Sequence, residues 1–193
     1  MSAKQIEKTK LLIGEGMEDK RFLESLVKNL GLEDIQVEEY GGKKNLNKYI
    51  KSLPVFPGFK NLVSLGITRD ADDSIESTQQ SIASIVESFQ KNIDKNLLIT
   101  FFILPDNKSP GMLEDLCLKS VCDREEYGCI ETYLQCVLES CNRQPNNLSK
   151  AKLQMWLASQ KEAGKRLAEA AEAGYWDWNH PAFDSIKEFL IKL

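Results

Sequence analysis

Apolar residues along the chain follow two spacing patterns, and segments of one pattern alternate with segments of the other. Short apolar runs of the kind found in buried strands lie at 10–14, 35–40, 62–67 and 97–104. Between these runs, apolar residues recur every three or four positions, as on one helix face, near 18–29, 46–53 and 75–89. Strands that alternate with helices are typical of βαβ units. The sequence therefore predicts an α/β fold with a mostly parallel four-stranded sheet, flanked by helices on both faces.

The rest of the chain is predicted to be helical. Helical spacing recurs near 111–120, 124–142, 148–160, 164–173 and 181–193. No internal repeat, low-complexity tract or flexible linker separates these segments from the α/β part. We therefore expect an α/β domain at 1–109 and a C-terminal helical extension at 110–193 that packs on it.

Acidic residues follow two of the predicted strands. Glu15 stands between two glycines at the end of the first strand, and Asp19 follows in the first turn of a helix, where an acid is favoured. Asp70 and Asp72 follow the third strand, and on an extended backbone residues two apart point to the same side. In open α/β sheets, ligands bind at the carboxyl ends of the strands. We therefore expect these four carboxylates to converge at that edge.

Four acids without histidine or cysteine among them make an all-oxygen set of ligands. Hard cations such as Mg²⁺ or Mn²⁺ prefer oxygen, whereas zinc prefers nitrogen or sulfur. The five cysteines form no C-x-x-C pair and are interpreted as small buried hydrophobic residues. The sequence therefore predicts a magnesium or manganese site, although each acid taken singly is also a common surface, loop or helix-capping residue.

The order strand–Glu–Gly–x–x–Asp–helix, followed by strand–Asp–x–Asp, resembles the Toprim domain of topoisomerases, primases and OLD-type nucleases. The resemblance covers residues 10–106. It implies a Toprim-like, Rossmann-like sheet with metal at the four acids, and catalysis by Glu15, Asp70 and Asp72 on nucleic acid backbones. The whole chain is similar to a small stand-alone Toprim-like family related to the OLD-type nucleases, a match that brings a fold and no substrate.

A further carboxylate follows the fourth strand, in the segment 105–116. Its Leu113–Glu114 pair is similar to the element by which OLD-type Toprim nucleases bring a carboxylate to a second metal, which implies that Glu114 is a ligand. An exposed acid on an amphipathic helix is the alternative. Asp106, in the same segment, is the weaker candidate.

Lysines near the same edge are candidates for holding phosphate. Gly41-Gly42-Lys43-Lys44 opens a helix, where backbone N–H groups and the two lysines could bind an anion, although the spacing is not that of a Walker A loop. Lys150 could reach the site from the helical extension. A solvated turn and ordinary surface lysines are the alternatives.

Composition and missing motifs exclude several classes of protein. The net charge of −4 argues against a broadly basic nucleic-acid binder, and no apolar run approaches the ~20 residues that span a bilayer. The N-terminus lacks a signal-peptide core, so we expect a cytoplasmic protein without membrane contact. A single histidine and no G-x-S-x-G motif argue against a Ser-His-Asp hydrolase.

Three functions stay open at this point. The first is a Mg²⁺- or Mn²⁺-dependent nuclease that acts on nucleic acid, alone or with a protein partner. The second is a regulatory module that binds metal or phosphate without turnover. The third is phosphotransfer on the aspartates, as in receiver domains, although the Glu–Gly–x–x–Asp loop resembles Toprim more closely.

Overall fold

Four parallel strands form the centre of the computed structural model, which describes residues 5–193 and so leaves out the first four residues of the N-terminus considered above. They are β1 (Lys10–Gly14), β2 (Ile35–Glu39), β3 (Ser64–Asp70) and β4 (Leu98–Leu104). Their order in the sheet is β2-β1-β3-β4, and each neighbouring pair is parallel. The predicted α/β class and parallel sheet are confirmed.

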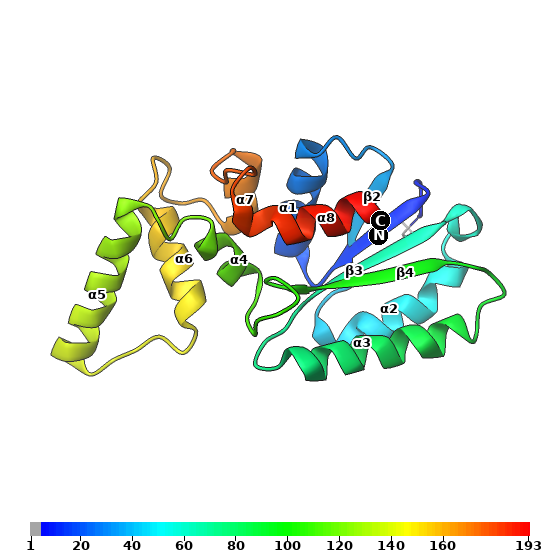
Figure 1. Ribbon diagram of the computed structural model, residues 1–193, viewed down its shortest axis with the longest axis horizontal. Helices are drawn as coiled ribbons and strands as arrows, with labels where there is room; N and C mark the ends of the chain where they lie inside the picture. The colour runs from blue at the N-terminus through cyan, green and yellow to red at the C-terminus, as the bar shows by residue number, and fades with distance from the viewer. Residues whose placement is uncertain (1–4) are drawn as a thin grey trace.

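Helices cover both faces of this sheet (Figure 1). One face carries α1 (Met17–Asn29) and α8 (Asp184–Lys192), and the other carries α2 (Leu46–Ser52) and α3 (Ile75–Gln90). Alternating strand residues serve the two faces. Leu12 packs in the α1 and α8 core, whereas Leu11 and Ile13 pack in the α2 and α3 core.

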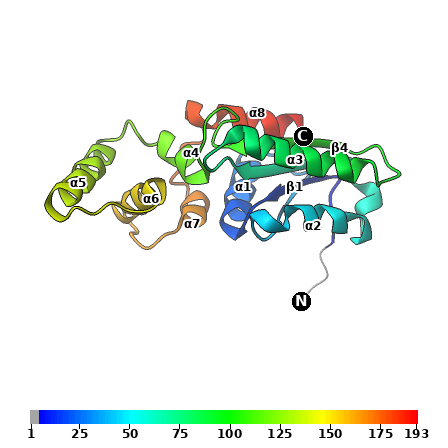
Figure 2. The same ribbon diagram turned by 90° about the horizontal axis from the view of Figure 1, so that it is seen from below.

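The remaining helices lie beyond the carboxyl ends of the strands (Figures 1 and 2). They are α4 (Leu113–Lys119), α5 (Glu125–Cys141), α6 (Leu148–Ala158) and α7 (Leu167–Glu172). Short 3₁₀ turns lie at η1 (Lys43–Asn45), η2 (Leu53–Val55), η3 (Phe59–Asn61) and η4 (Pro181–Phe183). All five helical segments predicted for the C-terminal part are present, so the predicted helical extension is confirmed.

Aromatic residues attach the C-terminal segment to the rest of the protein. The Trp176 ring stacks on Trp156 with centroids 4.9 Å apart, and the Trp178 ring meets Phe22 of α1 edge-on at 5.3 Å. Both indoles of the stacked pair are buried, and they share one hydrophobic core with α1 and α8. The predicted domain boundary at residue 109 stays a prediction, because helices on both sides of it contribute to this core.

Two expectations from the sequence were wrong in detail. Only Cys117 is buried, and the other four cysteines are exposed. Three of these four lie on α5, which packs along α6 and buries a single residue, Ile130. The third strand begins later than predicted and includes Asp70. Most of its polar residues are buried, and Thr68 Oγ1 donates to the Ile13 carbonyl at 3.3 Å.

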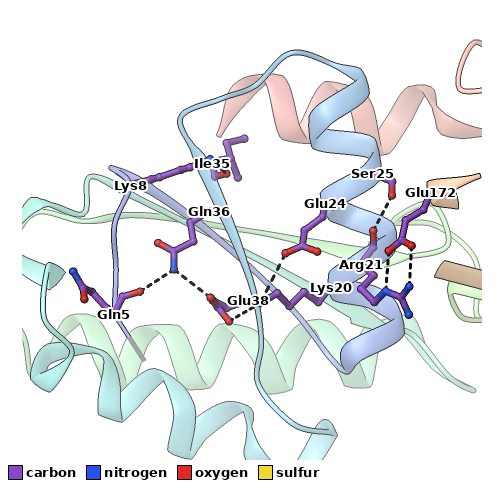
Figure 3. A network of polar contacts seen from close by, with 10 residues as sticks. All are labelled: Gln5, Lys8, Lys20, Arg21, Glu24, Ser25, Ile35, Gln36, Glu38 and Glu172. Atoms are coloured by element: carbon purple, nitrogen blue, oxygen red, sulfur yellow. Dashed lines mark hydrogen bonds and ion pairs between the residues drawn. The ribbon is translucent and has the colours of Figure 1, made fainter. Parts of the chain in front are cut away.

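Polar contacts border the exposed edge of the sheet at β2 (Figure 3). Lys20 of α1 forms an ion pair with Glu38 at 3.1 Å, and Lys8 Nζ donates to the Ile35 carbonyl at 3.1 Å. Charged side chains of this kind protect an edge strand from pairing with another chain.

Among the described residues, no helix is long and apolar enough to cross a membrane.

Candidate functional site

The end of β1 is tied to the loop that follows β2. The carbonyl of Glu15 accepts hydrogen bonds from the backbone N–H groups of Gly41 (3.1 Å) and Gly42 (2.8 Å), and its carboxylate accepts from the Lys43 N–H at 3.1 Å. Gly41 and Gly42 have φ angles of 80° and 98°, which glycine adopts without strain. The loop therefore fixes Glu15 at the carboxyl edge of the sheet.

Asp19 lies in the first turn of α1, close to the end of β1. Its Oδ2 accepts a hydrogen bond from the Gly16 N–H at 3.1 Å, which satisfies one of the free donors at the helix N-terminus. A Cβ on Gly14 would lie only 2.9 Å from the Asp19 Cβ. The glycine at the end of the strand is therefore needed for this close approach of strand and helix.

Asp70 is the last residue of β3 and joins the sheet to α4. Its Oδ1 accepts a hydrogen bond from the N–H of Leu113, the first residue of α4, at 3.0 Å. Glu114 follows Leu113 in α4, and its Oε1 lies 3.7 Å from the Nζ of Lys150 on α6. One hydrogen bond and one ion pair thus connect the sheet edge through α4 to α6.

Glu15, Asp19, Asp70 and Glu114 line a common cleft of about 910 Å³. They come from the end of β1, the start of α1, the end of β3 and the start of α4, so residues up to 99 positions apart meet there. Lys150 lines the same cleft. These five predicted residues are therefore brought together, although their roles as ligands stay a prediction.

The buried carboxyl groups of the cleft hold their protons more tightly than usual. Burial, together with smaller contributions from the neighbouring Asp19, Glu114 and Glu15, raises the pKa of Asp70 to about 8, against the hydrogen bond from Leu113. Burial also raises the pKa of Asp19 to about 6, with a smaller contribution from Glu15 and Glu114. The cleft therefore concentrates negative charge that a cation or a proton would relieve.

The donor set fits a hydrated divalent cation. Among the described residues, no three acids, histidines or cysteines are gathered closely enough to enclose a metal by themselves. Mg²⁺ keeps several of its waters and is commonly held by one or two carboxylates together with substrate phosphates. Spaced carboxylates such as Asp70 and Glu114 are therefore suited to Mg²⁺ or Mn²⁺, and unsuited to a closed structural metal site.

Asp72 lies apart from this cleft. Its φ of 51° is left-handed, so the strand-like alternation that placed it beside Asp70 does not hold there. Its backbone pairs with Gly111, and its carboxylate forms an ion pair with Lys43. Asp72 and Lys43 line a second, smaller hollow of about 580 Å³, and Lys44 lines neither. Their functional roles stay predictions.

Several residues that shape the site were missed from the sequence. Asp115 accepts hydrogen bonds from the Met112 N–H at 2.8 Å and from the Ser149 hydroxyl, which fastens the start of α6 to α4. Arg21 forms a two-pronged ion pair with Glu172, both contacts at 2.8 Å, which joins α1 to α7 (Figure 3). Only Asp115 had a local signal, since an acid three residues after a helix cap is a capping pattern.

Asp106, the weaker candidate, has a local role. Its carboxylate accepts from the N–H groups of Lys108 (3.0 Å) and Ser109 (2.8 Å), and these bonds, with Lys119, hold its pKa below the usual value against the effect of burial. It closes the turn after β4 and does not line the cleft.

Comparisons with known proteins give a family and a fold. A family model described as "Protein of unknown function (DUF3226)" matches residues 9–193. No curated protein matches the chain.

Two solved structures of the C-terminal region of the OLD protein from Xanthomonas campestris pv. campestris are similar. The one phased with iodine has 16% identity and a TM-score of 0.50, and the match covers 97% of this chain and 96% of that chain. The one phased with mercury has 17% identity and a TM-score of 0.48, with coverage of 97% and 98%. At such identities the likeness supports the fold alone.

Proposed function

From the geometry of its cleft, we propose that this chain, which belongs to the DUF3226 family, is a Toprim-type nuclease dependent on Mg²⁺ or Mn²⁺. The description of the family names no activity. The observation that carries the proposal is the convergence of four carboxylates from separate elements on one cleft. Clustered oxygen ligands of this kind are typical of phosphodiester chemistry. The motif resemblance and the fold shared with the OLD protein region support the same function.

Asp70 and Glu114 are proposed as the principal metal-holding residues, with Glu15 and Asp19 completing the acidic wall. A bound Mg²⁺ or Mn²⁺ supplies stabilisation of the negative charge that develops on the reacting phosphate. Leu113 holds the Asp70 carboxylate in place through its N–H, and the Gly41–Lys43 loop does the same for Glu15. The protein thus presents its carboxylates from fixed backbone positions, which is the condition for an ordered site.

Glu15 is also the proposed acceptor for a proton from the attacking water. Its carboxylate accepts one hydrogen bond, from the Lys43 N–H, which leaves the other oxygen available. Lys150 lines the same cleft and carries a positive charge beside Glu114, with 3.7 Å between its Nζ and the Glu114 carboxylate. It is placed to attract a phosphate toward the acidic wall, against the repulsion of the carboxylates.

A second candidate is a metal- or phosphate-binding module without turnover. The observation that favours it is the ion pair of Asp72 with Lys43, which joins one proposed catalytic acid to one proposed phosphate-binding lysine, away from the cleft. In a nuclease, substrate phosphate would have to separate this pair before either residue could act, whereas a module without turnover has no such requirement.

Calorimetry and cleavage on the same preparation separate the two candidates. Mn²⁺ is titrated into the full chain, and labelled single and double strands are then incubated with it in Mg²⁺, Mn²⁺ or chelator. Metal binding with metal-dependent cleavage supports the nuclease. Metal binding without cleavage of any strand supports the module, and no metal binding contradicts the nuclease and leaves only a phosphate-binding module.

A further inference from the structure

The cleft has a basic wall that the proposed chemistry does not use. Lys165 and Arg166, in the segment before α7, line the same cleft as the acids. Lys165 is paired with Glu162 at 3.0 Å, whereas the Arg166 guanidinium has no ion-pair or hydrogen-bond partner among residues 5–193. An exposed arginine beside a carboxylate-lined cleft is suited to a ligand that carries its own negative charge, and phosphate is the group that arginine binds best in this way.

The same cleft also offers apolar surface. Leu153, Leu157 and Leu167 line it as part of the core, and Met17, which also lines it, has 56% of its surface exposed. A site for inorganic phosphate or metal alone has no need of such residues. Methionine adapts its shape to flat ring systems, so Met17 provides a contact for an unstacked base.

The size of the cleft limits what can enter it. About 910 Å³ is near the upper end of the volumes that hold small molecules, roughly 300–1,000 Å³. Helices α1, α4 and α6 and the segment before α7 border the space. A short run of nucleotides fits in such a volume, which is too small to enclose a base-paired duplex.

We propose that the cleft takes a single strand of nucleic acid, with its phosphate between the acidic wall and Arg166 and a base against Met17. This inference rests on the proposed nuclease function, whose substrate class it specifies. Lys165 assists Arg166 as a second cation on the same wall. Duplex would then be bound only at a frayed end or an unpaired stretch.

Fluorescence anisotropy tests this with labelled oligothymidylate, alone and annealed to its complement, in Ca²⁺, another hard cation that carboxylates bind. We expect the single strand to bind at least about 10-fold more tightly than the duplex. Replacing both basic residues (Lys165→Ala with Arg166→Ala) should weaken single-strand binding by about 10-fold and lower the salt dependence by about 0.7 per lost phosphate contact. The matched control is Lys161→Ala, an exposed lysine outside the cleft, which should bind as the wild type does.

Equal or tighter binding of duplex would overturn the inference, as would unchanged binding by the double variant. Competition by thymidine monophosphate at the affinity of the strand would overturn it too, because the site would then hold a single nucleotide. The proposed nuclease function fails by a separate result, the lack of metal-dependent cleavage of any strand. Selective single-strand binding could persist in that case, so the two failures are distinguishable.

Discussion

Removing the charge of Asp70 should stabilise the metal-free protein. The substitution Asp70→Asn keeps an oxygen that can accept from the Leu113 N–H and removes the carboxylate. Burial and the neighbouring acids raise the Asp70 pKa from 3.8 to about 8, so the folded protein holds a proton that the unfolded chain releases. Stability of the wild type therefore falls as pH rises between these two values.

The magnitude follows from the same pKa values. From 3.8 to pH 7, at about 1.4 kcal/mol per pH unit, the cost to the folded wild type reaches about 4 kcal/mol. Water in the cleft relieves part of this cost, so we expect Asp70→Asn to be more stable than the wild type by about 2 to 4 kcal/mol at pH 7. Near pH 4 the two proteins should be equally stable, since both then carry a neutral group.

Urea unfolding in chelator, followed by tryptophan fluorescence from pH 4 to pH 8, measures this difference. The matched control is Asp73→Asn, an exposed aspartate just beyond β3, whose stability should follow that of the wild type at each pH. An Asp70→Asn protein that is less stable than the wild type at pH 7, or whose advantage does not grow with pH, would refute the reasoning. Asp70 would then be a structural acid that stabilises the start of α4.

Three further results are expected. Mg²⁺ should raise the melting temperature of the wild type by relieving the charge in the cleft, and the effect should be largely lost in Asp70→Asn; an equal rise in both would place the ion elsewhere. Trp176→Ala should cost about 3 to 5 kcal/mol of unfolding free energy, because it removes the ring stacked on Trp156; urea unfolding at pH 7 checks this, and a cost below about 1 kcal/mol would contradict the packing. A thiol reagent should modify four cysteines of the native protein quickly and leave Cys117 unmodified until the protein unfolds; rapid reaction of all five would contradict the burial of Cys117.

The fold could be predicted because its signals are local. The apolar runs and the helical spacing between them lie within single elements, and glycines mark the turn after β1. The first and last residues of β3 were harder to predict from the sequence. Its last residues are polar, and they become buried only through contacts such as that of Arg69 with Ser81 at 3.2 Å.

The site could be predicted only in part, for a related reason. Glu15, Asp19 and Asp70 follow strands or open helices, so the parallel topology alone brings them to one edge. The left-handed backbone at Asp72 ends the alternation of side chains along the strand, and the neighbouring sequence contains no pattern that predicts it. Arg166 reaches the cleft through the packing of the C-terminal helices, a long-range contact that leaves no local pattern.

The most direct test of the proposed nuclease is the rate at which the protein cleaves a labelled strand in Mg²⁺ or in Mn²⁺, with wild type, Asp70→Asn and Asp73→Asn compared at equal concentration. Asp70→Asn should lose at least about 100-fold of the wild-type rate, because it removes a proposed metal ligand, while Asp73→Asn keeps that rate. Cleavage that survives in Asp70→Asn, or that is absent from the wild type with either metal, would contradict the assignment of this cleft as a nuclease site.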